Sequence, residues 1–121
     1  MLDQYTSKIF EDVCCEYLRK LNKQNLLPFR FTKIGRWWNK NNEIDIMATN
    51  SNKDEFIIGE CKYKNSAFNM AELNALMSKF KPSNMESKLH YYLFSKNGFT
   101  DAVYKIGIEK GMNRISLDEI L

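Results

Sequence analysis

A chain of 121 residues that is 44% hydrophobic and 27% charged is long enough for one contiguous core and too apolar to be disordered. Its net charge of +3 does not by itself identify a nucleic-acid-binding protein. The three cysteines lack the CxxC spacing of zinc sites, no apolar run approaches the ~20 residues of a membrane span, and the N-terminus MLDQYTSK is unlike a signal peptide. We therefore expect one domain, residues 1–121, in the reducing cytoplasm, with no membrane partner.

The first predicted element is a helix over residues 2–22. Its apolar residues recur at three- and four-residue steps. The predicted core-facing stripe consists of Leu2, Tyr5, Ile9, Val13, Tyr17 and Leu21. Pro28 ends this pattern because proline has no amide hydrogen to donate within a helix.

Three extended segments follow at residues 30–38, 43–49 and 55–63, separated by the turn-rich stretches NKNN and NSNKD, and they predict an antiparallel meander. Asn69 and Glu72 have the spacing of a capping box and start a second helix that ends before Pro82. A strand at 90–95, a helix between the caps Thr100 and Gly111, and a short strand at 114–117 complete the chain. The order αβββαβ plus a C-terminal helix and short strand predicts an α/β fold with a mixed central sheet flanked by helices.

Charged residues interrupt two of these apolar strands. Because alternate strand residues share a face, Glu60 and Lys62 lie together at the end of a strand that is apolar on both faces. In the strand at 43–49, one predicted face carries Ile44, Ile46 and Ala48, and the other carries Glu43, Asp45 and Met47. Charges at the end of a buried strand need a partner.

If the two strands form a hairpin, Asp45 and Glu60 lie opposite each other, and two such carboxylates repel unless a proton or cation intervenes. Oxygen ligands of this kind suit Mg²⁺. Lys62 would then orient or help to deprotonate an attacking water and offset charge on a phosphate, which indicates phosphodiester hydrolysis. The alternative is an ion pair between Glu60 and Lys62 at the sheet edge, with Asp45 serving a turn.

Basic and aromatic residues near these strands are candidate nucleic-acid contacts. Arg36 and Trp37 could contact phosphate and stack on a base, although packing of both Trp37 and Trp38 in the core is the alternative. Lys64 could contact a phosphate, or it is an ordinary solvated lysine at a strand end.

The segments EIDIMATN and FIIGECKYK resemble the PD-(D/E)XK nuclease superfamily, with Ile44 where the superfamily name has proline. This resemblance implies a restriction-endonuclease-like core that binds Mg²⁺ or Mn²⁺ and hydrolyses DNA, with Asp45, Glu60 and Lys62 as catalytic residues. It also implies a further acidic residue from the first helix, for which Glu11 in KIFEDVCCEYL fits. Asp45, Glu60 and Glu11 are then the implied metal ligands.

Within that superfamily, the segments IGRWWNKNNEIDIMA, GECKYKN, LFSKNGFTD and ISLDEIL look like a domain of unknown function found at the C-terminus of archaeal-type AAA ATPases. The sequence has no GxxxxGK[ST] loop, so an ATPase domain would be a partner in the parent chain or in trans. The leading hypothesis is a metal-dependent DNA hydrolase, and the alternative is a catalytically silent module that docks onto an ATPase or nucleic acid. A homodimer would supply one site for each strand of a duplex, but no residue identifies a contact surface.

Overall fold

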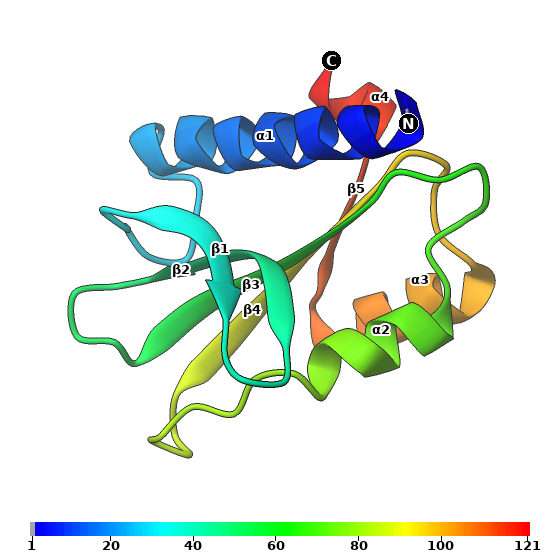
Figure 1. The fold of residues 1–121 in the computed structure, drawn as a ribbon. Coiled ribbons are helices and arrows are strands. Elements are labelled where there is room, and N and C mark those ends of the chain that lie inside the picture. The colour runs from blue at the N-terminus through cyan, green and yellow to red at the C-terminus, as the bar shows by residue number, and fades with distance from the viewer. Residues whose placement is uncertain (1) are drawn as a thin grey trace.

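The computed structural model describes the backbone of residues 2–121 and the side chains of residues 6–121 (Figure 1). The elements in chain order are α1 (Leu2–Lys23), β1 (Ile34–Trp38), β2 (Glu43–Thr49), β3 (Glu55–Lys62), α2 (Met70–Met77), β4 (Lys88–Ser95), α3 (Asp101–Lys110), β5 (Asn113–Ser116) and α4 (Leu117–Ile120). Helix α1 lies across one face of the sheet, whereas α2 and α3 lie on the other side.

The strands form one mixed sheet in the order β1-β2-β3-β4-β5. The first three strands are an antiparallel meander, and β3–β4 and β4–β5 are parallel pairs. A parallel pair needs a crossover connection, and α2 and α3 lie within the two crossovers. The predicted α/β fold with a mixed sheet and an antiparallel meander is confirmed.

Central strand β3 is covered on both faces. Ile57 belongs to a buried cluster with Leu18 of α1, while its neighbour Ile58 belongs to a second cluster with Leu73 of α2 and Val103 of α3. Water cannot solvate a charged side chain on a strand that is buried on both faces, so such a charge needs a partner from the protein.

The buried face of α1 differs from the predicted stripe by one position. Among the side chains described for this helix, Phe10, Cys14 and Leu18 are buried. Ile9 is 43% exposed and Val13 only partly buried, and the predicted members Leu2 and Tyr5 lie outside the described side chains. Because apolar residues stand next to each other along this helix, it carries two overlapping apolar stripes. The sheet covers the stripe that contains Phe10, Cys14 and Leu18.

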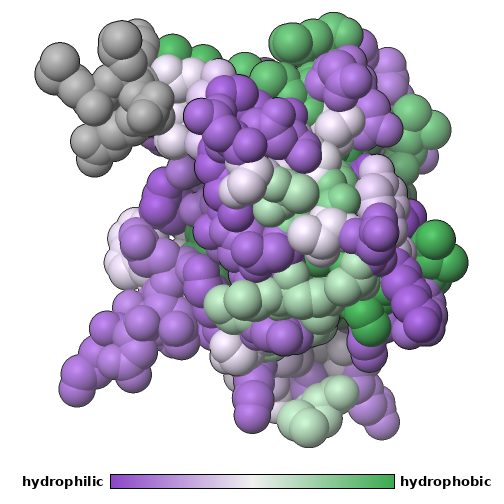
Figure 2. Space-filling view, turned by 90° about the vertical axis from the view of Figure 1, so that its right-hand side faces the viewer, coloured by the Kyte–Doolittle hydropathy of each residue, from purple (hydrophilic) through white to green (hydrophobic). Residues whose placement is uncertain are grey.

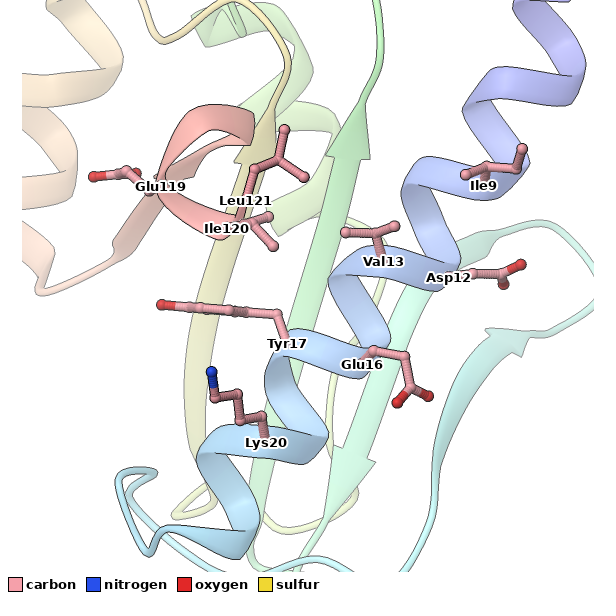
Figure 3. A pocket seen from close by; sticks show the side chains of 9 residues that line it. All are labelled: Ile9, Asp12, Val13, Glu16, Tyr17, Lys20, Glu119, Ile120 and Leu121. Carbon is pink, nitrogen blue, oxygen red and sulfur yellow. The ribbon is translucent and has the colours of Figure 1, made fainter.

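Of the predicted stripe, Tyr17 and Leu21 pack against the core cluster, whereas Ile9 and Val13 border the surface. Val13 and Tyr17 of α1 line a hollow of about 640 Å³ together with Ile120 and Leu121 from the end of the chain, and Figure 3 shows these side chains around the same space. Helix α4, which forms the other wall of the hollow, was not predicted. Its first turn is capped by Ser116, whose backbone N–H donates to the carboxylate of Glu119.

Strand β1 starts four residues later than predicted, because the backbone of Phe31 has a partner outside the sheet. The side chain of Asn22 accepts a hydrogen bond from the Phe31 N–H at 3.1 Å and donates one to its carbonyl at 2.9 Å. With both backbone groups satisfied by an amide side chain, this segment does not enter the ladder.

The predicted helix caps are confirmed. Asn69 accepts from the Glu72 N–H at 2.9 Å, and Glu72 accepts from the Asn69 N–H at 3.0 Å. Thr100 caps α3, and Gly111 ends it with a left-handed φ of +68°. Helix α2 ends at Met77, before the predicted limit.

Hydrophilic side chains cover much of the face shown in Figure 2, with smaller apolar areas between them. Within the described residues, no helix combines the length and apolar composition that a membrane crossing requires.

Candidate functional site

The pairing of β1 with β2 contains a β-bulge. Trp37 pairs with Ile44 and Gly35 pairs with Met47, so a two-residue step in β1 faces a three-residue step in β2. The extra residue reverses the alternation of faces. Ile44 consequently packs in the cluster with α2, and Ile46 packs in the cluster with α1. The predicted common face is right for Ile46 and Ala48 and wrong for Ile44.

Asp45 lies in this bulge, where β2 separates from β3. The β2–β3 ladder ends with the pair Ile46–Gly59. Beyond that pair, the carboxylate of Asp45 accepts a hydrogen bond from the backbone N–H of Cys61 at 2.9 Å. The Asp45 side chain thus takes the place of a strand partner, and this bond holds its carboxylate beside Glu60.

Glu60 is a buried acid with only 4% of its surface exposed. Its Oε2 atom lies 3.6 Å from the Nζ of Lys62 and 3.5 Å from the Nζ of Lys79. Burial is the main cause that raises the pKa of Glu60 to about 7, and the nearby charge of Asp45 adds to the rise, while both lysines oppose it. Near neutral pH this carboxyl group is therefore poised between its two forms.

Glu11 approaches the same region from α1, but its carboxylate forms an ion pair with Arg36. Burial, followed by the charge of Asp45, raises the pKa of Glu11, and the Arg36 guanidinium opposes the rise. These three residues line a hollow of about 250 Å³. Glu11 is thus electrostatically linked to Asp45 without joining it in a cluster.

Among residues 6–121, no three His, Cys, Asp or Glu side chains are grouped as they would be around a metal ion. Asp45 and Glu60 form an interacting pair of acids. Its chemistry fits a hard divalent cation, because both groups offer carboxylate oxygens and their mutual repulsion is only partly offset. Glu11, the predicted third ligand, is engaged by Arg36 through one of its carboxylate oxygens.

Two lysines at the end of β3 are held by an acid from α2. Lys64 lies 2.9 Å from one carboxylate oxygen of Glu72, and Lys62 lies 4.0 Å from the other. Sequence reasoning did not connect Glu72 or Lys79 with the site. Two features of the sequence could have linked them: their seven-residue spacing, which is typical of one helix face, and the position of Glu72 at the start of a helix.

The two tryptophans of β1 differ in environment. Trp37 packs edge-on against Phe80 with ring centroids 5.3 Å apart, whereas Trp38 is 66% exposed. Packing of both in the core is therefore wrong for Trp38, and Trp37, the predicted nucleic-acid contact, is the less accessible of the two. Arg36 is partly exposed and pairs with Glu11 and Glu43.

A sequence model of the DUF234 family, described as archaea bacterial proteins of unknown function, matches residues 1–80. An uncharacterized protein of Methanocaldococcus jannaschii is 48% identical over 62 residues, which is 51% of this chain. The match spans 14% of that relative's length.

Two solved structures share the fold. A repair endonuclease from Pyrococcus abyssi has a TM-score of 0.54 at 10% identity, over 88% of this chain and 46% of that one. A protein of unknown function has a TM-score of 0.56 at 14% identity, over 87% of this chain and 62% of that one. At these identities, the likeness establishes a restriction-endonuclease-like fold.

Proposed function

Because this chain belongs to the DUF234 family, a C-terminal domain of archaeal ATPases with an endonuclease-like fold, we propose that it is a metal-dependent DNA phosphodiester hydrolase. The observation that carries this proposal is the pair of carboxylates where β2 and β3 separate. Asp45 is held there by the Cys61 N–H, and Glu60 is buried beside it with Lys62 3.6 Å away. An acid pair with an adjacent lysine is suited to the hydrolysis of a phosphodiester.

In this proposal, Asp45 and Glu60 bind Mg²⁺ or Mn²⁺, and Glu11 adds a third carboxylate once it leaves Arg36. When bound, the ion supplies Lewis-acid polarisation of the phosphodiester. Lys62 orients the attacking water and offsets the negative charge that develops on the phosphate. Glu72 positions Lys62, because its carboxylate is fixed by the capping box and lies 4.0 Å from the ammonium.

DNA is the proposed substrate because the repair endonuclease shares the fold and basic side chains surround the acid pair. Arg36 and Lys64 are proposed to contact phosphates. If a phosphate replaced Glu11 as the partner of Arg36, Glu11 would be released. For stacking on a base, Trp38 is better exposed than Trp37. The ATPase domain is the proposed protein partner, in the parent chain or in trans.

The second candidate function is that of a docking module, which has the same fold but does not catalyse hydrolysis. The ion pair between Glu11 and Arg36 favours it, because this pair keeps the third acid out of the site. The two functions differ in whether the acid pair binds a divalent cation.

Isothermal titration of Mn²⁺ into the wild type and into Glu60→Gln separates these functions without knowledge of the substrate. The hydrolase requires saturable binding that is lost in Glu60→Gln and kept in Glu86→Gln, a control at an exposed acid. Equal binding to all three proteins, or binding to none, would refute the metal site and favour the docking module.

Cleavage of DNA in the presence of Mg²⁺ tests turnover directly. We expect Lys62→Met and Asp45→Asn to abolish cleavage while the circular dichroism spectrum stays unchanged. Cleavage that persists in both variants would assign the activity to another site or to a contaminant.

A further inference from the structure

Glu60 has a second cationic partner that the proposed mechanism does not use. The Nζ of Lys79 lies 3.5 Å from Oε2 of Glu60, the same oxygen that Lys62 approaches at 3.6 Å. The Lys79 side chain is 23% exposed, so most of it is removed from water. Two ammonium groups therefore share one oxygen of a proposed metal ligand.

The surrounding structure holds Lys79 in this position. Its backbone N–H donates to the Leu76 carbonyl at 3.1 Å, directly after α2. The next residue, Phe80, packs against the rings of Trp37 and Phe56 at centroid distances of 5.3 and 5.0 Å. The backbone is thus anchored on both sides of a lysine whose long side chain reaches Glu60.

The two lysines differ in their other partners. Lys62 also approaches Glu72 at 4.0 Å. In the part of the chain whose side chains are described, Glu60 is the only acidic partner of Lys79. A cation that enters the site would leave Lys62 with an acid nearby but would remove the only one from Lys79.

We propose that Lys79 is a positioning residue for the metal site: a displaceable counter-ion that neutralises Glu60 until a divalent cation takes its place. This inference rests on the proposed function. An ammonium and a divalent cation compete for the same carboxylate oxygen and repel each other at short range. Lys79 therefore stabilises the metal-free protein and weakens metal binding, so it sets the metal concentration at which the site fills.

The test is titration of Mn²⁺ at pH 8 into the wild type, Lys79→Met and Lys79→Arg, with thermal unfolding of each metal-free protein. We expect Lys79→Met to bind Mn²⁺ about fivefold more tightly, because one competing charge is gone, and to unfold at a lower temperature. Lys79→Arg keeps the charge and should stay near wild type. Lys81→Met removes an exposed lysine two residues away and serves as the control.

A purely structural role for Lys79 would make Lys79→Met both less stable and weaker in Mn²⁺ binding, and this result would overturn the inference. If Lys79→Met does not fold, Lys79→Gln provides the same comparison. Binding by the wild type without a gain in the variant refutes only the inference. Absence of binding to every protein refutes the proposed function as well, whereas binding by Lys79→Met alone would support the inference.

Discussion

At the scale of single residues, Glu60 opposes the stability of the metal-free fold. Burial and the neighbouring Asp45 raise its pKa from the usual 4.5 to about 7. The folded protein therefore holds a proton that the unfolded chain has already released above about pH 4.5. Below about pH 4.5 both states are protonated and Glu60 does not destabilise the fold. As the pH rises from there through about 7, the free energy of unfolding falls, because the buried carboxyl group must ionise.

The Glu60→Gln substitution removes this dependence. We expect the metal-free variant to exceed the wild type in stability at pH 8 by on the order of 3 kcal/mol, and to differ little at pH 4.5. Urea denaturation at the two pH values measures the difference, with Glu86→Gln as the control. A wild-type advantage at pH 8 would mean that the ion pairs of Glu60 outweigh its burial.

At the scale of elements, the start of α2 has two functions, because Glu72 both completes the capping box and holds Lys62 and Lys64. Substitutions can separate them. Asn69→Ala removes a cap and should cost about 1 kcal/mol of unfolding free energy. Glu72→Gln keeps an oxygen that accepts from the Asn69 N–H but loses the charge, so we expect a smaller loss of stability and a marked loss of DNA cleavage. Equal effects of both variants on cleavage would refute a separate positioning role for Glu72.

The end of β1 allows a similar separation of packing from binding. Trp37→Ala removes the contact with Phe80 and should destabilise the protein by about 2 kcal/mol, since the ring is only partly buried. Trp38→Ala should change stability by less than about 0.5 kcal/mol, because its ring is exposed, and should weaken DNA binding. Chemical denaturation and fluorescence anisotropy with labelled DNA measure the two effects. Unchanged DNA affinity in Trp38→Ala would remove this residue from the binding surface.

At the scale of the whole molecule, the site depends on the packing of several elements, because Asp45 comes from β2, Glu60 from β3 and Glu72 from α2. We propose that residues 1–121 act as one domain, since both apolar clusters are built on the same sheet. A cation that binds only the folded site must then stabilise the whole chain.

Mn²⁺ at a hundredfold excess over its dissociation constant should therefore raise the unfolding free energy by about 2.7 kcal/mol. We expect Asp45→Asn to lose most of this gain, which a thermal melt with and without Mn²⁺ would show. A gain of the same size in Asp45→Asn would place the bound ion elsewhere.

The sequence by itself determined the order of the elements from α1 to β5, the caps of α2 and α3, and the acid–lysine pattern of β2 and β3, because these depend on residues close together in the chain. Tertiary contacts decided the rest. The sheet selected which of two apolar stripes of α1 is buried, Asn22 kept Phe31 out of β1, and the bulge in β2 placed Ile44 and Ile46 on opposite faces. The pairing of Glu60 with Lys79 and of Glu11 with Arg36 also became visible only in the fold, because these basic residues come from distant segments. Local patterns specify which residues can form an element, but packing energy between elements decides which face is buried and which charges meet.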